Sequence, residues 1–274
     1  MHHHVLYDDG HHKCVAFSMP HDEESVPSNQ FLIIDGKEAA VIDPGGDLTF
    51  TPLTMNIVKH TNLNNLRYVI GSHQDPDIIA SMPRWLIHVE HASVLIPKLW
   101  ERFLPHYNSA FTKGRLKQSL SERLITIPDG GGYYPLGNSG IVAMPAHFLH
   151  SVGNFQFYDP ISKILFTGDM GASMVGNSGE AVTNFRSHIS SMEGFHRRYM
   201  VSKKVTRLWA DAVRDLDISM MVPQHGCRLE GQEVFQQFLD WISQLDCGID
   251  LFNEQSYQFK QHLPAPVAEA ELSL

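Results

Sequence analysis

Residues 71–78 read Gly-Ser-His-Gln-Asp-Pro-Asp-Ile and follow directly on the apolar run Tyr68–Ile70. An imidazole and two carboxylates, from His73, Asp75 and Asp77, therefore leave the end of a predicted buried strand. Alternate residues of an extended segment point the same way, so we expect the three side chains to converge on one spot. A ligand set of one imidazole nitrogen and several carboxylate oxygens favours iron or manganese. A zinc site of the soft type would be rich in thiolates instead. This stretch predicts a metal site.

Three further candidate ligands lie later in the chain. His150, Asp169 and His225 each stand near a small or turn residue, as ligands on tight loops do. Together with the first three residues they indicate a centre that holds two metal ions.

The composition is that of an ordinary globular protein. The chain has 274 residues, of which 43% are hydrophobic and 19% charged, enough to bury a sizeable core. A formal net charge of −9 argues against binding to nucleic acid or an anionic membrane. The longest apolar runs are too short for a transmembrane helix. The cysteines Cys14, Cys227 and Cys247 are far apart, which argues against a disulfide scaffold and favours a cytoplasmic location.

Apolar patterning predicts strands and helices in alternating groups. Residues 31–34 and 39–42 flank an Asp-Gly turn and predict a hairpin. Further strands are expected at 67–71, 139–144, 154–158, 163–166 and 218–222, and helices at 50–61, 78–88, 91–104, 187–214 and 231–245. This order favours a layered α/β protein in which both faces of the strands are covered. No linker divides the chain, so we expect a single domain over 1–274, with 263–274 as a poorly ordered tail.

The spacing of the later residues resembles that of a known superfamily. His150 is followed nineteen residues later by Asp169, in a Phe-Thr-Gly-Asp turn, and His225 follows Val-Pro-Gln. These features are similar to the metallo-β-lactamase fold superfamily, in which a ligand histidine precedes a bridging aspartate. Asp43, in Ile-Asp-Pro-Gly, resembles the early aspartate that supports the metal loop. The resemblance implies a four-layer αββα sandwich.

The first cluster distinguishes the branches of that superfamily. Its hydrolases carry His-x-His-x-Asp-His and its flavodiiron proteins carry His-x-Glu-x-Asp-His. This chain has His73, Asp75 and Asp77 in the order His-x-Asp-Pro-Asp, followed by Ile78. That pattern resembles the flavodiiron-like branch without a flavodoxin domain, the oxygen-binding diiron proteins. The resemblance covers about residues 5–250.

Carried over to this sequence, the resemblance implies two iron ions, with manganese or zinc as alternatives, and no flavin in this chain. The first metal would be bound by His73, Asp75, His150 and the bridging Asp169. The second would be bound by Asp77, Asp169 and His225. Ile78 stands where flavodiiron proteins have a histidine, so the second metal is expected to keep an open position beside an apolar wall.

Other interpretations of these residues remain open. Asp75 and Asp77 could instead cap a helix that starts near Ile78, because aspartate is a common N-cap. His147 competes with His150 as a ligand, although its spacing to Asp169 fits less well; we assign it a catalytic role in delivering protons.

Several histidines near the N-terminus stand apart from the candidate site. His2–His4 are either native or the remnant of a purification tag. His11 and His12 lie in a polar stretch and are expected to be solvated.

The leading functional hypothesis is a non-haem diiron protein that binds, and in one version reduces, O2 or NO. As an oxidoreductase it would need electrons from a separate redox protein, because the chain has no room for a flavin domain. As a sensor it would report oxygen to a signalling partner. The alternative is a metal-dependent hydrolase. Whether the protein forms a homodimer is left open.

Overall fold

The structure is a computed structural model that describes residues 1–19, 28–107, 114–116, 120–258 and 262. Two β-sheets form its centre. The first sheet has the order β1 (His2–Asp8), β2 (His12–Ser18), β3 (Asn29–Asp35), β4 (Glu38–Ile42), β5 (Leu66–Ile70), β6 (Ser93–Pro97) and β7 (Leu124–Ile127). The second has the order β13 (Leu229–Glu230), β12 (Met220–Val222), β11 (Ile164–Phe166), β10 (Phe155–Asp159), β9 (Ser139–Pro145) and β8 (Gly132–Leu136).

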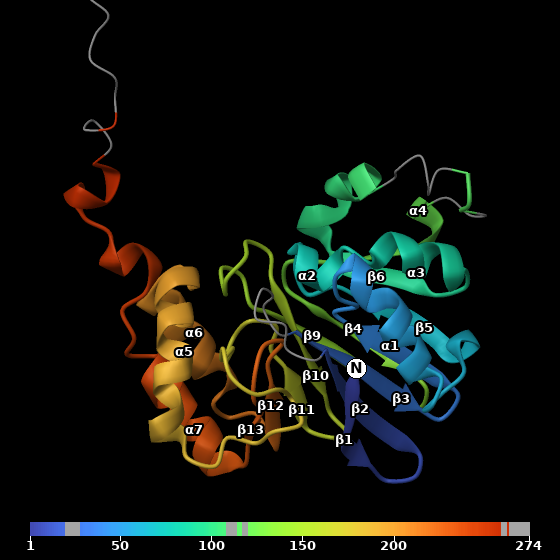
Figure 1. The fold of residues 1–274 in the computed structure, drawn as a ribbon, viewed down its shortest axis with the longest axis horizontal. Helices are drawn as coiled ribbons and strands as arrows, with labels where there is room; N and C mark the ends of the chain where they lie inside the picture. Colours follow the sequence, from blue (N-terminus) through green and yellow to red (C-terminus); the bar gives the residue numbers. More distant parts are fainter. Residues whose placement is uncertain (20–27, 108–113, 117–119, 259–261, 263–274) are drawn as a thin grey trace, which may run out of the picture.

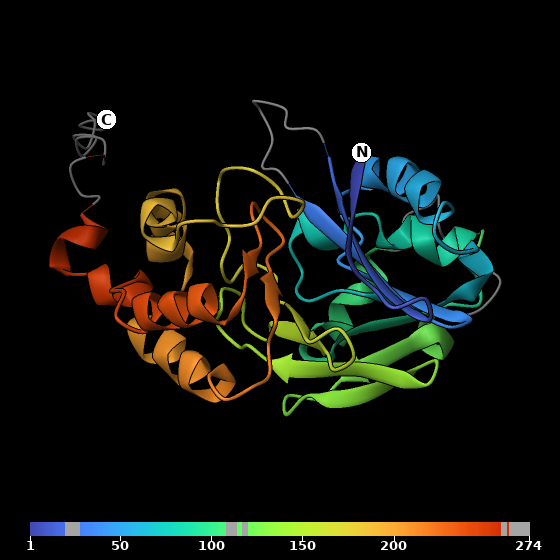
Figure 2. The same ribbon diagram turned by 90° about the horizontal axis from the view of Figure 1, so that it is seen from below.

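Helices cover the outer face of each sheet. The first sheet is covered by α1 (Phe50–Ile57), α2 (Pro76–Ile79), α3 (Met82–His88) and the 3-10 helix η3 (Lys98–Tyr107), with α4 (Leu120–Arg123) nearby. The second is covered by α5 (Phe185–Tyr199), α6 (Lys203–Val213) and α7 (Gln232–Ile242). Figures 1 and 2 show these two groups of helices on opposite flanks of the molecule. The predicted four-layer αββα sandwich is confirmed.

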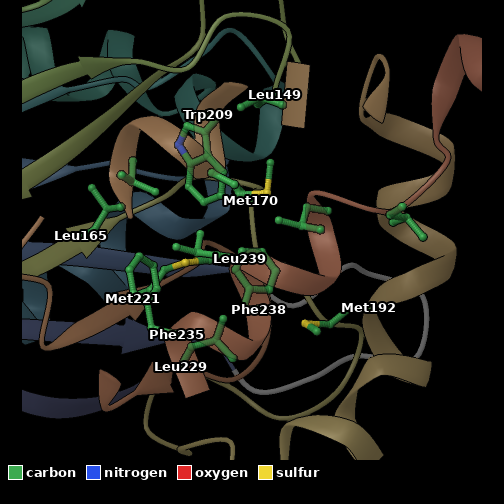
Figure 3. Packing of buried hydrophobic residues seen from close by; sticks show 14 of the residues in the cluster. Leu149, Leu165, Met170, Met192, Trp209, Met221, Leu229, Phe235, Phe238 and Leu239 are labelled. Carbon is green, nitrogen blue, oxygen red and sulfur yellow. The ribbon is translucent and has the colours of Figure 1, made fainter. Parts of the chain in front are cut away.

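The buried strands explain this layering. Along β3, Phe31 and Ile33 point between the two sheets, whereas Leu32 and Ile34 point toward the helices α1–α3. Because both faces are covered, the strand reads as a continuous apolar run rather than an alternating one. A third apolar cluster joins the second sheet to its helices, where Phe235 of α7 packs with Met221 of β12 (Figure 3).

Some predicted elements were wrong. A helix was predicted over 91–104, but residues 93–97 form the parallel strand β6 and a 3-10 helix starts only at Lys98. A short apolar run such as Ser-Val-Leu-Ile-Pro cannot be assigned to strand or helix from periodicity alone. The strands β1, β2, β7, β8 and β13 were not predicted. Residues 2–8, including the three histidines, pair with β2, and the predicted tail over 263–274 lies outside the described residues.

The strand ends determine where the candidate ligands lie. His73 follows the carboxyl end of β5, while Asp169 and His225 follow the carboxyl ends of the parallel neighbours β11 and β12. His150 lies in the loop between β9 and β10, close to the point where Phe155 N–H bonds Ser72 C=O at 3.1 Å. The same end of the sandwich therefore carries all of these loops. In the part of the chain that the structure describes, every helix is too short or too polar to cross a bilayer.

Candidate metal centre

Four of the predicted ligands converge on one point. The ligating atoms of His73, Asp75, His150 and Asp169 all lie within 4.8 Å of one another. Nε2 of His150 is 2.7 Å from Oδ2 of Asp169 and 3.2 Å from Oδ2 of Asp75. Nε2 of His73 is 3.6 Å from the same Asp169 oxygen. Two imidazole nitrogens and two carboxylates thus surround a common space.

The other two predicted ligands lie on the far side of Asp169. Nε2 of His225 is 3.3 Å from Oδ1 of Asp169 and 3.4 Å from Oδ2 of Asp77. One oxygen of Asp169 therefore faces His73 and His150, and the other faces His225. This is the arrangement that a carboxylate bridging two ions requires.

The turn that carries Asp169 is held tightly. Gly168 has φ +56°, a left-handed conformation that glycine adopts without strain. Its carbonyl accepts a hydrogen bond from Gln224 N–H at 2.7 Å, and Thr167 Oγ1 donates to Met170 C=O at 2.6 Å. These contacts tie the turn after β11 to the loop that carries His225.

A relay of buried side chains orients His73. Ser72 Oγ donates to Oδ2 of Asp43 at 3.0 Å, and Ser72 N–H donates to Oδ1 at 2.8 Å. The same hydroxyl lies 3.0 Å from Nδ1 of His73. A serine hydroxyl has one proton, so with Asp43 as its acceptor it must accept from Nδ1–H of His73. The lone pair of His73 is then on Nε2, which faces the cluster.

The loops on the two sides of the cluster are also joined directly. Ser151 Oγ, next to His150, donates to Oε1 of Gln74 at 2.6 Å, next to His73. The amide of Asn154 bonds the carbonyl of Leu149. Such contacts hold ligand side chains in place before any ion arrives.

The electrostatics of the cluster are those of a cation site. The imidazoles of His150 and His73 hold the pKa of Asp75 well below its usual range. Burial would lower the pKa of His73, but Asp169 and Asp75 raise it to about 10. Burial likewise opposes charge on His150, and Asp169 and Asp75 raise its pKa to about 9. Protons thus occupy the imidazoles when no metal is bound, and a cation would replace them.

The residues fit a pair of metal ions. Nε2 of His73 and Oδ1 of Asp169 are buried, and neither has a hydrogen-bond partner among the described residues. Buried polar atoms are rarely left in that state, and two ions, one on each side of Asp169, would satisfy them. A donor set of three imidazoles and three carboxylates is rich in oxygen, which matches iron or manganese.

The helix-cap interpretation of Asp75 is not supported. Asp75 does occupy the N-cap position of α2, but its side chain makes no capping hydrogen bond in the described structure and points to the imidazoles instead. Asp77 lies inside α2 rather than in an extended segment. The prediction that His73, Asp75 and Asp77 converge on one spot through strand alternation was therefore wrong, because Asp75 faces His150 and Asp77 faces His225 from the start of a helix.

Two other residues named from the sequence do not reach the cluster. His147 has Nε2 2.9 Å from the carbonyl of Asp129. Its role in delivering protons therefore stays a prediction, without a contact to the ligands. Ile78 was expected to form an apolar wall beside the open position of the second metal. Its side chain is fully buried in the core under α1–α3, together with residues such as Leu53 and Trp85.

Sequence reasoning missed the residues that α5 brings to the site. The ring of Tyr199 lies 5.6 Å from that of His150, and the ring of Phe195 lies 6.2 Å from that of His225. His196, also on α5, accepts a hydrogen bond from Gly171 N–H at 3.0 Å, two residues after Asp169. These residues are far from the ligands in sequence, and no motif pointed to them.

An apolar cavity of about 220 Å³ adjoins the centre. His73 and Gln74 form one side, and Ile79, Ile96, Trp100 and Phe103 are among its other walls. Apolar walls of this kind favour small apolar ligands over charged ones.

Comparison with known proteins identifies the family. The model of the "ODP family beta lactamase" matches residues 26–226. The chain belongs to the ODP family. A solved structure described as the peroxy diiron species of chemotaxis sensor ODP is 34% identical, with a TM-score of 0.79 over 92% of this chain and 98% of that one. The apo state of chemotaxis sensor ODP from T. denticola is also 34% identical, with a TM-score of 0.78 over 91% of this chain and 97% of that one.

More distant structures share the fold. A variant of the flavo-di-iron protein from Thermotoga maritima is 15% identical, with a TM-score of 0.72 over 88% of this chain and 60% of that one. The ODP family thus has the metallo-β-lactamase type of fold that the sequence predicted. No curated protein matches the chain.

Proposed function

We propose that this protein is a non-haem diiron protein that binds O2 and acts as an oxygen sensor. The observation that carries the proposal is the position of Asp169, whose two oxygens face two separate groups of histidines, 2.7 Å from His150 and 3.3 Å from His225. The 34% identity to a chemotaxis sensor described with a peroxy diiron species supports the same conclusion.

The proposed ligand assignment follows the two halves of the cluster. His73, Asp75, His150 and one oxygen of Asp169 would hold the first iron. Asp77, His225 and the other oxygen of Asp169 would hold the second. The bound irons supply the electrons and the open coordination positions that O2 or NO needs.

The chain's own residues position and shield the site. Asp43 and Ser72 fix the imidazole of His73 so that Nε2 faces the cluster. Phe195 and Tyr199 lie beside His225 and His150 and limit the access of water. The apolar cavity next to His73 offers a small apolar gas a place to collect beside the centre.

A sensing role is favoured over a reductase role. Full reduction of O2 or NO would require an external electron donor, whereas sensing requires a signalling partner that responds to the state of the centre. We assign the protein to the cytoplasm and expect no flavin in this chain. A homodimer is compatible with either role. The metal-dependent hydrolase alternative is less well supported, because a site with Asp75 in place of a histidine is poorer in nitrogen than hydrolytic zinc sites are.

The experiment is elemental analysis with optical spectroscopy. Protein purified without oxygen should contain two irons per chain and should develop a new visible absorption band when air is admitted. Zinc in place of iron, with no band after exposure to air, would overturn the proposal in favour of a hydrolase. The variant Asp169→Asn, measured in parallel, should hold less iron and lose the band.

A further inference from the structure

A second cluster of metal-ligating side chains lies between the two sheets, at the end opposite the metal centre. His12 and Cys14 belong to β2, and Asp159 ends β10. β3 separates the two ends, because its first residue, Asn29, bonds Gln224 C=O beside the metal centre, while its last residue, Asp35, pairs with His12.

His12 was expected from the sequence to be solvated, but the structure shows that it is buried. Its exposed fraction is 3%, and those of Cys14 and Asp159 are 0% and 1%. The polar run before His12 forms the tight β1–β2 turn, which leaves His12 itself inside the sandwich.

The distances in this cluster suit a tetrahedral ion. Oδ2 of Asp159 is 2.7 Å from Nε2 of His12 and 3.2 Å from Sγ of Cys14, and the last two atoms are 3.8 Å apart. A zinc ion with bonds of about 2.0–2.3 Å holds its ligand atoms about 3.3–3.8 Å apart. The edge between His12 and Asp159 must open by roughly half an ångström, and Asp159 must also move away from Cys14 and from Ser162 Oγ. Ser162 Oγ, 3.5 Å from Cys14 Sγ, offers a fourth donor.

Hydrogen bonds alone cannot satisfy all the donor groups in this cluster. Oδ2 of Asp159 faces four donor groups: Nε2 of His12, Sγ of Cys14, and both the N–H and the hydroxyl of Ser162. A carboxylate oxygen has about two lone-pair sites, so the donors outnumber them. A cation that replaces the His12 and Cys14 protons would remove the excess and use those atoms as ligands.

The surroundings of His12 also fit a ligand. Its other ring nitrogen, Nδ1, is buried without a hydrogen-bond partner among the described residues and lies 3.9 Å from Oδ1 of Asp35. A carboxylate behind the far nitrogen is the usual way in which a ligating imidazole is oriented.

We propose that His12, Cys14 and Asp159 bind a zinc-type divalent cation, with Ser162 Oγ or a water molecule as the fourth ligand. Binding releases the thiol proton of Cys14 and the proton shared between Nε2 of His12 and Asp159, and the thiolate and carboxylate then balance the two positive charges. The ion would join β2 of one sheet to β10 of the other, which makes its role structural.

Cobalt provides the test, because a thiolate ligand gives Co²⁺ an intense near-ultraviolet charge-transfer band. The full chain, freed of metal with a chelator, is titrated with Co²⁺. Neither the ligands of the metal centre nor His2–His4 include a thiol, so the band reports on cobalt bound by a cysteine whether or not the diiron proposal holds. The expected result is one equivalent of thiolate-bound cobalt per chain.

Matched variants assign the band to one cysteine. The chain has three cysteines, so the double variant Cys227→Ser/Cys247→Ser keeps Cys14 alone and should keep the band. Cys14→Ser should lose it, and Asp159→Asn should weaken cobalt binding by at least tenfold. A wild type without the band, or a double variant without it, overturns the proposal and leaves a hydrogen-bonded cluster only. The double variant decides the question even if Cys14→Ser does not fold.

Discussion

The hydroxyl of Ser72 lies 3.0 Å from Nδ1 of His73, and its proton is donated to Asp43. The direction of this relay matters because it leaves the lone pair of His73 on the nitrogen that faces the candidate metals. Asp43 is buried and has φ +53°, so the backbone is held in a conformation that few non-glycine residues adopt. Such supporting contacts commonly determine metal affinity as much as the ligands do.

We therefore expect Ser72→Ala to weaken iron binding at the first metal by about 10–100-fold, because His73 loses the group that fixes its ring. The measurement is iron affinity by competition with a chromophoric chelator. Ser243→Ala is the matched control: its hydroxyl is buried and bonds Asp240 C=O, but it lies at the C-cap of α7, far from the site. Equal affinities for the Ser72 variant and the wild type would contradict the relay.

Asp169 and Asp77 should differ in how many metals they control. Asp169→Ala is expected to lose both metals, since one oxygen faces His150 and the other faces His225. Asp77→Ala should mainly empty the second metal, because its carboxylate lies 3.4 Å from His225. Iron per chain, measured by elemental analysis, separates the two. The exposed Asp47→Ala should keep the wild-type content, and an Asp169 variant that retains both irons would show that the carboxylate does not bridge.

The candidate ligands could be predicted from sequence because each stands in a short motif at a strand end. Asp75 and Asp77 were expected to converge through strand alternation, whereas in the structure they lie at the start of α2 and face different histidines, His150 and His225. His12 could not be placed, because its burial depends on the pairing of β2 with β1 and β3. Tyr199 could not be assigned to the site either, since only the packing of α5 against the loops brings it beside His150.

The position of Ile78 changes what a histidine there should do. Since flavodiiron proteins have a histidine at this position, Ile78→His would be expected from the sequence alone to add a ligand to the second metal. Because the side chain is fully buried in the core under α1–α3, the imidazole would instead be an unpartnered polar group in an apolar environment. We expect Ile78→His to destabilise the protein by about 2–4 kcal/mol.

Chemical denaturation of the metal-free protein measures this effect. Ile78→Val, which keeps the site apolar, should cost only about 0.5–1.5 kcal/mol. If the histidine variant were as stable as the wild type and bound the second iron more tightly, its imidazole would have left the core and reached the cluster.

His196 should make the fold sensitive to acid. It is fully buried, and burial lowers its pKa to about 4 despite the opposing effects of Met192 C=O and the charge of Asp169. Nε2 accepts the hydrogen bond from Gly171 N–H, so protonation would break that bond and bury a charge. The folded state therefore takes up this proton less readily than the unfolded state, in which the pKa is near 6.5.

The direction of the pH dependence of stability follows from this difference in pKa between the folded and unfolded states. The contribution of neutral His196 to stability is fully present above pH 6.5 and is lost as the pH falls toward 4, by about 3 kcal/mol in total. His196→Gln, whose amide oxygen can still accept from Gly171, should lose this part of the acid dependence. Unfolding free energies of both metal-free proteins between pH 4 and 7 provide the measurement, because the metal ligands titrate in both and cancel in the difference. His88→Gln, at an exposed helix end, is the matched control for replacing a histidine by glutamine. Parallel curves for the wild type and His196→Gln would mean that the buried ring does not resist protonation, and that the hydrogen bond from Gly171 N–H does not hold it in the neutral form.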